Sequence, residues 1–85
     1  MTDQMEMPKY KCHKVVHALE ISSIKHHSDG TATITPKEEG YAPFLVNADY
    51  VKRHEPKTGG YFVVYEDGYR SWAPKKTFES GYTRI

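Results

Sequence analysis

The clearest pattern of apolar and polar residues lies in residues 59–74, GGYFVVYEDGYRSWAP, where two short runs flank the dipeptide Asp67-Gly68. Two such runs around Asp-Gly are typical of a β-hairpin with a two-residue type I′ turn, which needs positive φ at its central residues. Directly paired residues of a hairpin lie on the same face of the sheet. The expected register therefore gathers four large or charged side chains on one face: Tyr61, Tyr65, Arg70 and Trp72.

The two faces of this hairpin differ in composition. Phe62 and Val64 lie on the first face and suit a core, whereas the second face is aromatic and carries polar groups, as surfaces that meet a partner often do. Phe78 can pack against this aromatic face and leave no surface for binding. If Phe78 packs on the first face instead, the aromatic face is free, and we expect it to bind another protein or to form a symmetric homodimer.

Residues 10–46 predict further strands. Residues 10–24 are rich in β-branched residues but alternate imperfectly, which predicts a long strand with a bulge or with burial on both sides. Residues 26–30, HHSDG, predict a turn, so residues 31–35, TATIT, are expected to pair back onto the first strand. A short apolar stretch at residues 44–46 follows a loop bounded by prolines. These runs predict a mainly antiparallel sheet.

Two short helices are expected beside this sheet. Asn47 is a good N-cap for a helix over residues 48–54, which Pro56 stops. Pro74 suits the first position of a second helix, PKKTFES, and Gly81 suits its C-terminal cap. Helical periodicity gives the first helix an inner face of Ala48 and Val51, with His54 beside them.

These elements predict a single α+β domain over residues 10–85, with a small twisted sheet, two short helices and an edge strand at residues 82–85. A flexible N-terminal segment is expected at residues 1–9. The chain of 85 residues suffices for one small core, and its formal net charge of +1 supplies no strong attraction for a polyanion. The sequence shows no run long enough for a membrane span and no signal peptide, so we expect a cytoplasmic protein.

Candidate catalytic and metal-binding groups are few. Cys12 is the single cysteine, which excludes an intramolecular disulfide and a zinc site built from several cysteines. Its neighbour His13 points to the opposite face of a regular strand, so we expect a structural rather than a reactive thiol. His13 and His17 are too far apart on such a strand to bind one ion, and His26 lies at an exposed turn. We therefore expect no enzymatic activity, no metal and no cofactor.

Two segments of the chain are similar to known sequences. Residues 11–21, KCHKVVHALEI, and residues 40–85 resemble a family of small uncharacterised proteins from tailed bacteriophages and prophages. The most specific part of the resemblance is residues 54–74, HEPKTGGYFVVYEDGYRSWAP. The function of that family is unassigned. The resemblance therefore implies a phage origin and a bacterial host cytoplasm, and it assigns no catalytic or binding residue.

The most consistent function is that of a small phage accessory protein that acts by binding a host protein, a phage protein or a second copy of itself. The alternative is a module that binds single-stranded nucleic acid, which combines a basic surface with aromatic side chains on which bases stack. Acidic residues between the basic ones favour an ordinary solvated surface instead. The residues that carry the alternative are Lys52, Arg53, Lys57, Lys75 and Lys76, with Tyr61, Tyr65 and Trp72.

Overall fold

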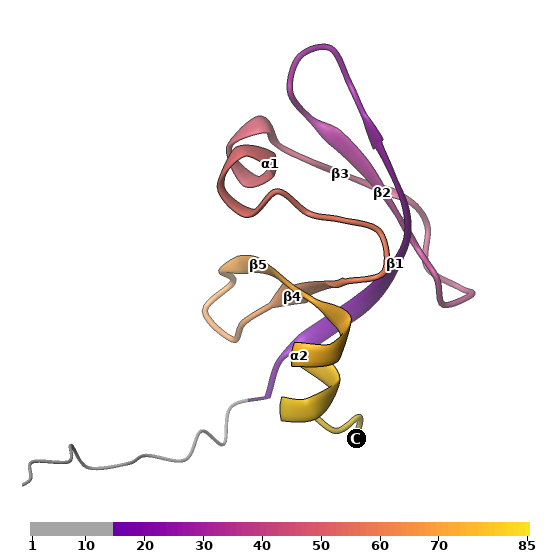
Figure 1. Cartoon of the computed structure of the whole chain (residues 1–85), viewed down its shortest axis with the longest axis vertical. Helices are drawn as coiled ribbons and strands as arrows, with labels where there is room; N and C mark the ends of the chain where they lie inside the picture. Colours follow the sequence, from indigo (N-terminus) through magenta and orange to yellow (C-terminus); the bar gives the residue numbers. More distant parts are fainter. Residues whose placement is uncertain (1–14) are drawn as a thin grey trace, which may run out of the picture.

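The structure of the chain is a computed structural model that describes residues 15–85. The expectations for residues 1–9, for Cys12 and for His13 therefore lie outside the described residues. Strands and helices follow in this order (Figure 1): β1 (His17–His26), β2 (Ala32–Pro36), β3 (Phe44–Val46), α1 (Ala48–His54), β4 (Tyr61–Val64), β5 (Arg70–Ala73) and α2 (Lys75–Gly81).

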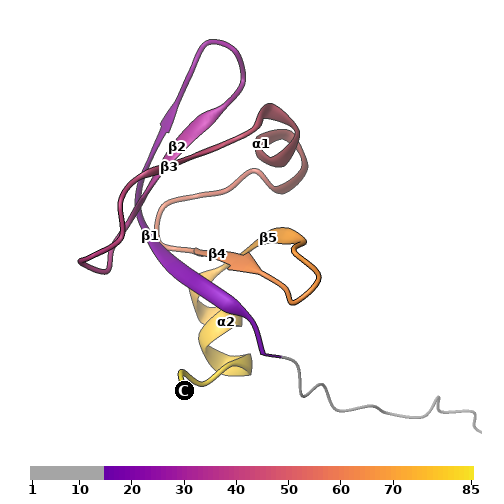
Figure 2. The same cartoon turned by 180° about the vertical axis from the view of Figure 1, so that it is seen from behind.

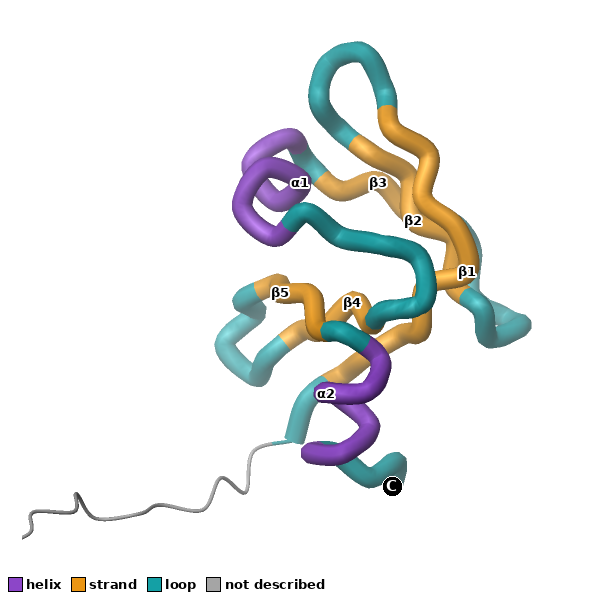
Figure 3. Tube along the Cα trace, in the orientation of Figure 1, coloured by secondary structure: helices purple, strands orange, loops and turns teal. Residues whose placement is uncertain are grey.

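The five strands form one antiparallel sheet in the order β3-β2-β1-β4-β5. The sheet curls, so that its two ends approach each other around α1, as the two opposite views show (Figures 1 and 2). α2 lies beyond the β4–β5 hairpin (Figure 3). The predicted α+β class is confirmed: the chain forms a curled five-stranded antiparallel sheet with two short helices.

β1 is the strand that both halves of the sheet share. Its first half pairs with β4 over His17–Glu20, and its second half pairs with β2 as far as His26. The register shifts between Ile21 and Ser23, which is the bulge or irregularity that the imperfect alternation predicts. Ile21 N donates to Gly60 O at 2.8 Å, and Gly59 N donates to Ile21 O at 3.0 Å. The backbone of Ile21 is therefore paired at the point where β1 changes partner.

The core lies inside the curled sheet, against α1. Its buried members are Ile21, Ala32, Ile34, Val46, Tyr50 and Phe62.

α1 joins the two edges of the sheet. It begins directly after β3, where Asn47 Oδ1 accepts a hydrogen bond from Tyr50 N at 2.8 Å, so the predicted N-cap is confirmed. The hydroxyl of Tyr50 donates to Ser71 O on β5 at 2.8 Å. Tyr50 is the buried residue of this helix and Ala48 is exposed. The expected inner face is therefore wrong at Ala48, because the Tyr50 ring packs 5.6 Å from the ring of Phe62.

The C-terminal residues differ from the sequence expectation. Pro74 is the N-cap of α2 rather than its first residue, and Gly81 is the last helical residue, with Tyr82 as the C-cap. Residues 82–85 pair with no strand in the described part of the chain, so the predicted edge strand is wrong. Arg84 is instead held by Glu38, with Nη1–Oε1 and Nη2–Oε2 distances of 2.7 and 3.1 Å.

The β4–β5 hairpin turns through a three-residue loop. Tyr65 N donates to Tyr69 O at 2.9 Å, and Gly68 N donates to Tyr65 O at 2.8 Å. Asp67 Oδ1 accepts from Tyr69 N at 3.0 Å. Gly68 has a φ of 89°, as expected for the residue that follows a type I turn in a three-residue hairpin loop. The predicted two-residue turn is therefore wrong, although Gly68 does adopt positive φ.

The β1–β2 loop repeats this arrangement. His27 N donates to Thr31 O at 2.9 Å, and Gly30 N donates to His27 O at 3.1 Å. Asp29 Oδ1 accepts from Thr31 N at 3.0 Å, and Gly30 has a φ of 92°. Asp-Gly thus occupies the second and third loop positions in both hairpins. The turn predicted at residues 26–30 and the pairing of residues 31–35 with the first strand are confirmed.

The extra loop residue shifts the register of the β4–β5 pair by one. Phe62 pairs with Trp72 and Val64 pairs with Arg70, where the two-residue turn predicts Ala73 and Ser71. A shift of one residue moves a strand's side chains to the other face. Trp72 and Arg70 therefore share the face of Phe62, and the predicted face that combines them with Tyr61 and Tyr65 is wrong.

Replacement of Gly68 by valine tests the loop. No heavy atom lies within 4 Å of a Cβ built at Gly68, so the cost comes from the backbone conformation, which a β-branched residue resists. We expect the free energy of unfolding to fall by about 1–3 kcal/mol, measured by urea denaturation. Gly81→Ala is the control, since Gly81 also has open space but lies in a helix; equal midpoints for the two variants would contradict the loop geometry.

Candidate functional site

The four side chains expected to form one binding face do not share one face in the structure. Tyr61 faces α2, Trp72 packs on the core, Arg70 lies beside α1, and Tyr65 lies at the end of the hairpin next to Tyr69. The change of register explains the separation of Tyr61 from Arg70 and Trp72. The single aromatic face is therefore replaced by two separate surfaces.

The first surface is formed where α2 covers Tyr61. The rings of Tyr61 and Phe78 stack with centroids 4.3 Å apart, and Phe78 stacks in turn on Tyr82 at 4.7 Å. The Tyr61 hydroxyl donates to Glu79 Oε2 at 2.6 Å, and this hydrogen bond is the main reason that the pKa of Tyr61 rises to about 12. Of the two placements considered for Phe78, the structure shows the one that covers Tyr61.

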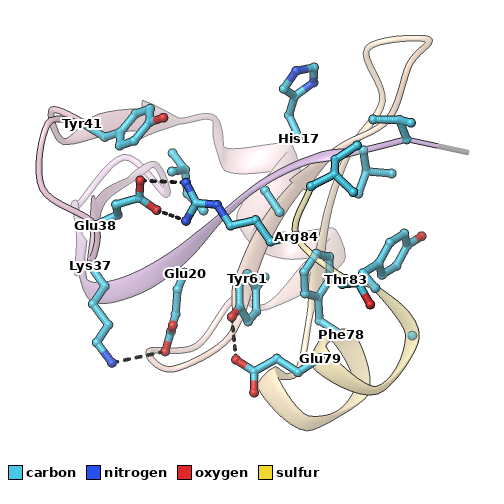
Figure 4. Close-up of a pocket in the computed structure, with 17 residues that line it drawn as sticks. His17, Glu20, Lys37, Glu38, Tyr41, Tyr61, Phe78, Glu79, Thr83 and Arg84 are labelled. Atoms are coloured by element: carbon cyan, nitrogen blue, oxygen red, sulfur yellow. Dashed lines mark hydrogen bonds and ion pairs between the residues drawn. The ribbon is translucent and has the colours of Figure 1, made fainter.

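An open groove of about 1400 Å³ extends from these rings along the first half of β1 (Figure 4). We call it the aromatic groove; its apolar lining includes Val15, Tyr41, Tyr61, Phe78, Tyr82 and Ile85.

Several charged residues in and beside the aromatic groove form ion pairs with one another. Glu20 Oε2 lies 3.1 Å from Lys75 Nζ and 3.7 Å from Lys37 Nζ, and the hydrogen bond from Lys75 is the largest cause of the lowered pKa of Glu20. The hydrogen bond from Arg84 likewise lowers the pKa of Glu38. These carboxylates are ionised and neutralised by neighbouring cations.

Trp72 is a packing residue. Its indole packs against the core, and Nε1 donates to Lys57 O at 3.3 Å. A Cβ built at Gly60 would lie 2.4 Å from the indole ring, so the chain at Gly60 passes directly over Trp72. This contact joins β5 to the segment that also binds the backbone of Ile21.

The second surface lies between α1 and the β4–β5 loop. Tyr69 OH lies 3.3 Å from His54 Nε2, and the rings of Tyr65 and Tyr69 have centroids 6.0 Å apart. Arg53 pairs with Asp49 at 3.3 Å. We call this surface the Arg70 patch, and its members are Arg53, His54, Tyr65, Tyr69 and Arg70.

A depression of about 320 Å³ lies in the Arg70 patch, with Tyr50 and Asn47 among its lining residues. Arg70 and Tyr65 are among the binding residues that the sequence predicts, whereas Tyr69 and His54 are not. Asp-Gly at the second and third loop positions is the signal that would place Tyr69 correctly, because that loop type sets the register. The contact of Tyr69 with His54 joins residues 15 positions apart and has no signal in either segment alone.

Two further structural features bear on metal binding and on membrane insertion. Among residues 15–85, no group of three or more His, Cys, Asp or Glu side chains is placed to hold a metal ion. The helices of this described range are too short and too polar to cross a membrane.

Comparison with known proteins identifies one solved phage structure. The chain is similar to the monomeric form of the phage L decoration protein, determined by NMR in solution, with 33% sequence identity and a TM-score of 0.66. The match covers 82% of this chain and 52% of that protein, so the chain spans about half the length of the decoration protein. No protein-family model matches the chain, and no curated protein matches it. The structural match supports the phage origin implied by the sequence resemblance.

Separate replacement of Trp72 and Tyr65 tests the two surfaces. Trp72→Ser removes a ring that packs on the core, and we expect the free energy of unfolding to fall by roughly 2–4 kcal/mol. Tyr65→Ser removes a half-exposed ring at the hairpin end, so we expect a loss of about 1 kcal/mol or less. Chemical denaturation measures both. A larger loss for Tyr65→Ser than for Trp72→Ser would show that the register described above is wrong.

The pKa of Tyr61 tests the contact between β4 and α2. We expect Tyr61 to titrate at about 12, followed by NMR of the ring carbon that bears the hydroxyl. Since this pKa lies above that of an unfolded tyrosine, the stabilisation is complete below about pH 10 and is lost as the pH rises through 12. Glu79→Gln should lower the pKa, because the amide lacks the negative charge that opposes the phenolate. Glu66→Gln, the control in the hairpin loop, should leave it unchanged.

Proposed function

We propose that this chain is a phage decoration protein that binds the outer surface of the protein shell of a phage particle. The observation that carries the proposal is the likeness to the phage L decoration protein, which holds for sequence and fold together over most of this chain. Since the match covers only 52% of that protein, the proposal concerns the activity of the domain described here. The natural setting of this activity is a bacterial host cell, where phage shells assemble.

A role in binding rather than catalysis is consistent with the state of the carboxylates in the aromatic groove. A general acid or base works best when its pKa lies near the operating pH. The pKa values of Glu20 and Glu38 are instead lowered by hydrogen bonds from cationic side chains. Both groups are thus suited to holding neighbouring segments together, and we propose that the chain is not an enzyme.

A protein partner accounts for the surfaces better than single-stranded nucleic acid does. Stacking of successive bases requires aromatic rings along one continuous surface, whereas Tyr61 and Tyr65 lie on the opposite face of the hairpin from Trp72. Two of the basic residues named for that alternative, Arg53 and Lys75, are paired with Asp49 and Glu20. The partner in this proposal is therefore the shell protein.

Cosedimentation with purified phage shells tests the proposal. The full chain is mixed with shells of the phage that encodes it, and with shells of phage L stripped of their own decoration protein. We expect saturable binding to at least the first kind of shell, with the same amount bound to shells filled with DNA and to empty shells. Absence of binding to both kinds of shell would contradict the proposed function.

Two measurements separate the alternatives in the same experiment. Single-stranded DNA immobilised on a column should not retain the chain at physiological salt; retention that falls steeply with salt would favour the nucleic-acid module instead. Sedimentation of the chain alone reports self-association, which would favour a homodimer as the binding unit. A monomer that binds shells and not DNA is the expected combination.

A further inference from the structure

The two surfaces of the domain differ in how their charges are balanced. Lys37, Lys75 and Arg84, which lie in or beside the aromatic groove, are each within 3.7 Å of a carboxylate of the same chain. The depression in the Arg70 patch is lined by two arginines and one aspartate. Asp49 is already paired with Arg53. Among residues 15–85, no carboxylate forms an ion pair with Arg70, so this depression has a surplus of positive charge.

The Arg70 patch also has the composition of a protein interface. Tyrosine and arginine are enriched where proteins bind one another, whereas lysine and glutamate are depleted there. The patch contains two of each enriched type, and Tyr69 is 45% exposed. Tyr69 precedes Arg70 in the sequence and lines the same depression, and its ring lies 6.0 Å from that of Tyr65. These rings provide contact area around a cation that is available to a partner.

The elements that carry the patch are fixed by contacts within the domain. α1 is held by its Asn47 cap and by the hydrogen bond from Tyr50 to Ser71. The loop before Arg70 is closed by two backbone hydrogen bonds and by Asp67. A binding surface that is already ordered loses less conformational entropy when its partner binds.

We propose that the Arg70 patch is the shell-binding surface and that its depression receives an acidic side chain of the shell protein. A guanidinium forms two parallel hydrogen bonds with a carboxylate, and Arg70 lacks such a partner in the described chain. The depression has a volume of about 320 Å³, which is large enough to receive one side chain of the partner. This inference rests on the proposed function and specifies the chemistry of its partner.

An acidic side chain fits this patch better than a phosphate backbone does. Glu66 and Asp67 lie at the exposed end of the same hairpin, and Asp49 lines the depression. A polyanion that follows the surface would approach these three carboxylates, whereas a single carboxylate can contact Arg70 alone. The local charge therefore favours one acidic group on a protein surface.

The test compares charge changes on the two sides of the domain. We expect Arg70→Glu to weaken cosedimentation with shells at least tenfold and Arg70→Ala to weaken it by a smaller factor, with both variants folded. Arg70 is exposed, so its replacement leaves the core intact, which circular dichroism and the unfolding midpoint check. Lys76→Glu makes the same change in net charge on α2, at an exposed position, and should bind as the unmodified chain does.

A second measurement distinguishes failure of this inference from failure of the proposed function. If the unmodified chain binds shells and Arg70→Glu binds equally well, the inference is wrong and the function stands. If the unmodified chain binds no shells, the proposed function is wrong, and an NMR titration with a short Asp- and Glu-containing peptide examines the patch by itself. The signals of Arg70 Nε–H and of the Tyr69 ring should then shift with the peptide and remain unchanged with its Asn- and Gln-containing counterpart. Absence of that shift would overturn the inference.

Discussion

The rest of the structure depends on the hydrogen bonds that the backbone of β1 makes where it changes partner. A strand in the middle of a sheet must satisfy its backbone groups on both sides. At Ile21, the segment at Gly59 and Gly60 supplies these bonds on one side, and Glu20 O accepts from Lys37 N at 2.8 Å on the other. The irregularity after Ile21 bends the strand at this point. The side chain of Ile21, 1% exposed, thereby becomes the centre around which both halves of the sheet curl.

This bend determines what surrounds the candidate binding surface. Because the sheet curls, its edge strands β3 and β5 approach the same helix, and Tyr50 of α1 can reach Ser71 on β5. The same helix brings His54 to Tyr69 on the adjoining loop. The Arg70 patch is therefore assembled from α1 and from the β4–β5 hairpin, which also contact each other directly through Tyr50 with Ser71 and His54 with Tyr69.

The two surfaces differ in how far their charged side chains are paired within the chain. In the aromatic groove, Tyr61 and Phe78 stack while Glu20, Lys37 and Lys75 neutralise one another, so this side holds α2 against the sheet. Exposed ion pairs of this kind contribute little to stability individually, but they leave few charges for a partner. The depression in the Arg70 patch is lined by two arginines and by Asp49, which is paired with Arg53. The likeness to the phage L decoration protein supports the proposed shell-binding role, and this unbalanced charge is the reason that we propose the Arg70 patch as the binding surface.

Local signals in the sequence determined the elements themselves: Asn47 caps α1, Asp-Gly closes both tight hairpins, and imperfect alternation marks the bend in β1. These features involve residues within a few positions of one another, so the sequence alone is sufficient for them. The register of β4 and β5 is different, because Asp67-Gly68 suits both a two-residue and a three-residue loop and each places Gly68 at positive φ. Only tertiary packing decided between them, by placing Trp72 over Gly60 and against the core. Since strand side chains alternate with a period of two, that choice moved Arg70 to the face of α1 and separated it from Tyr61.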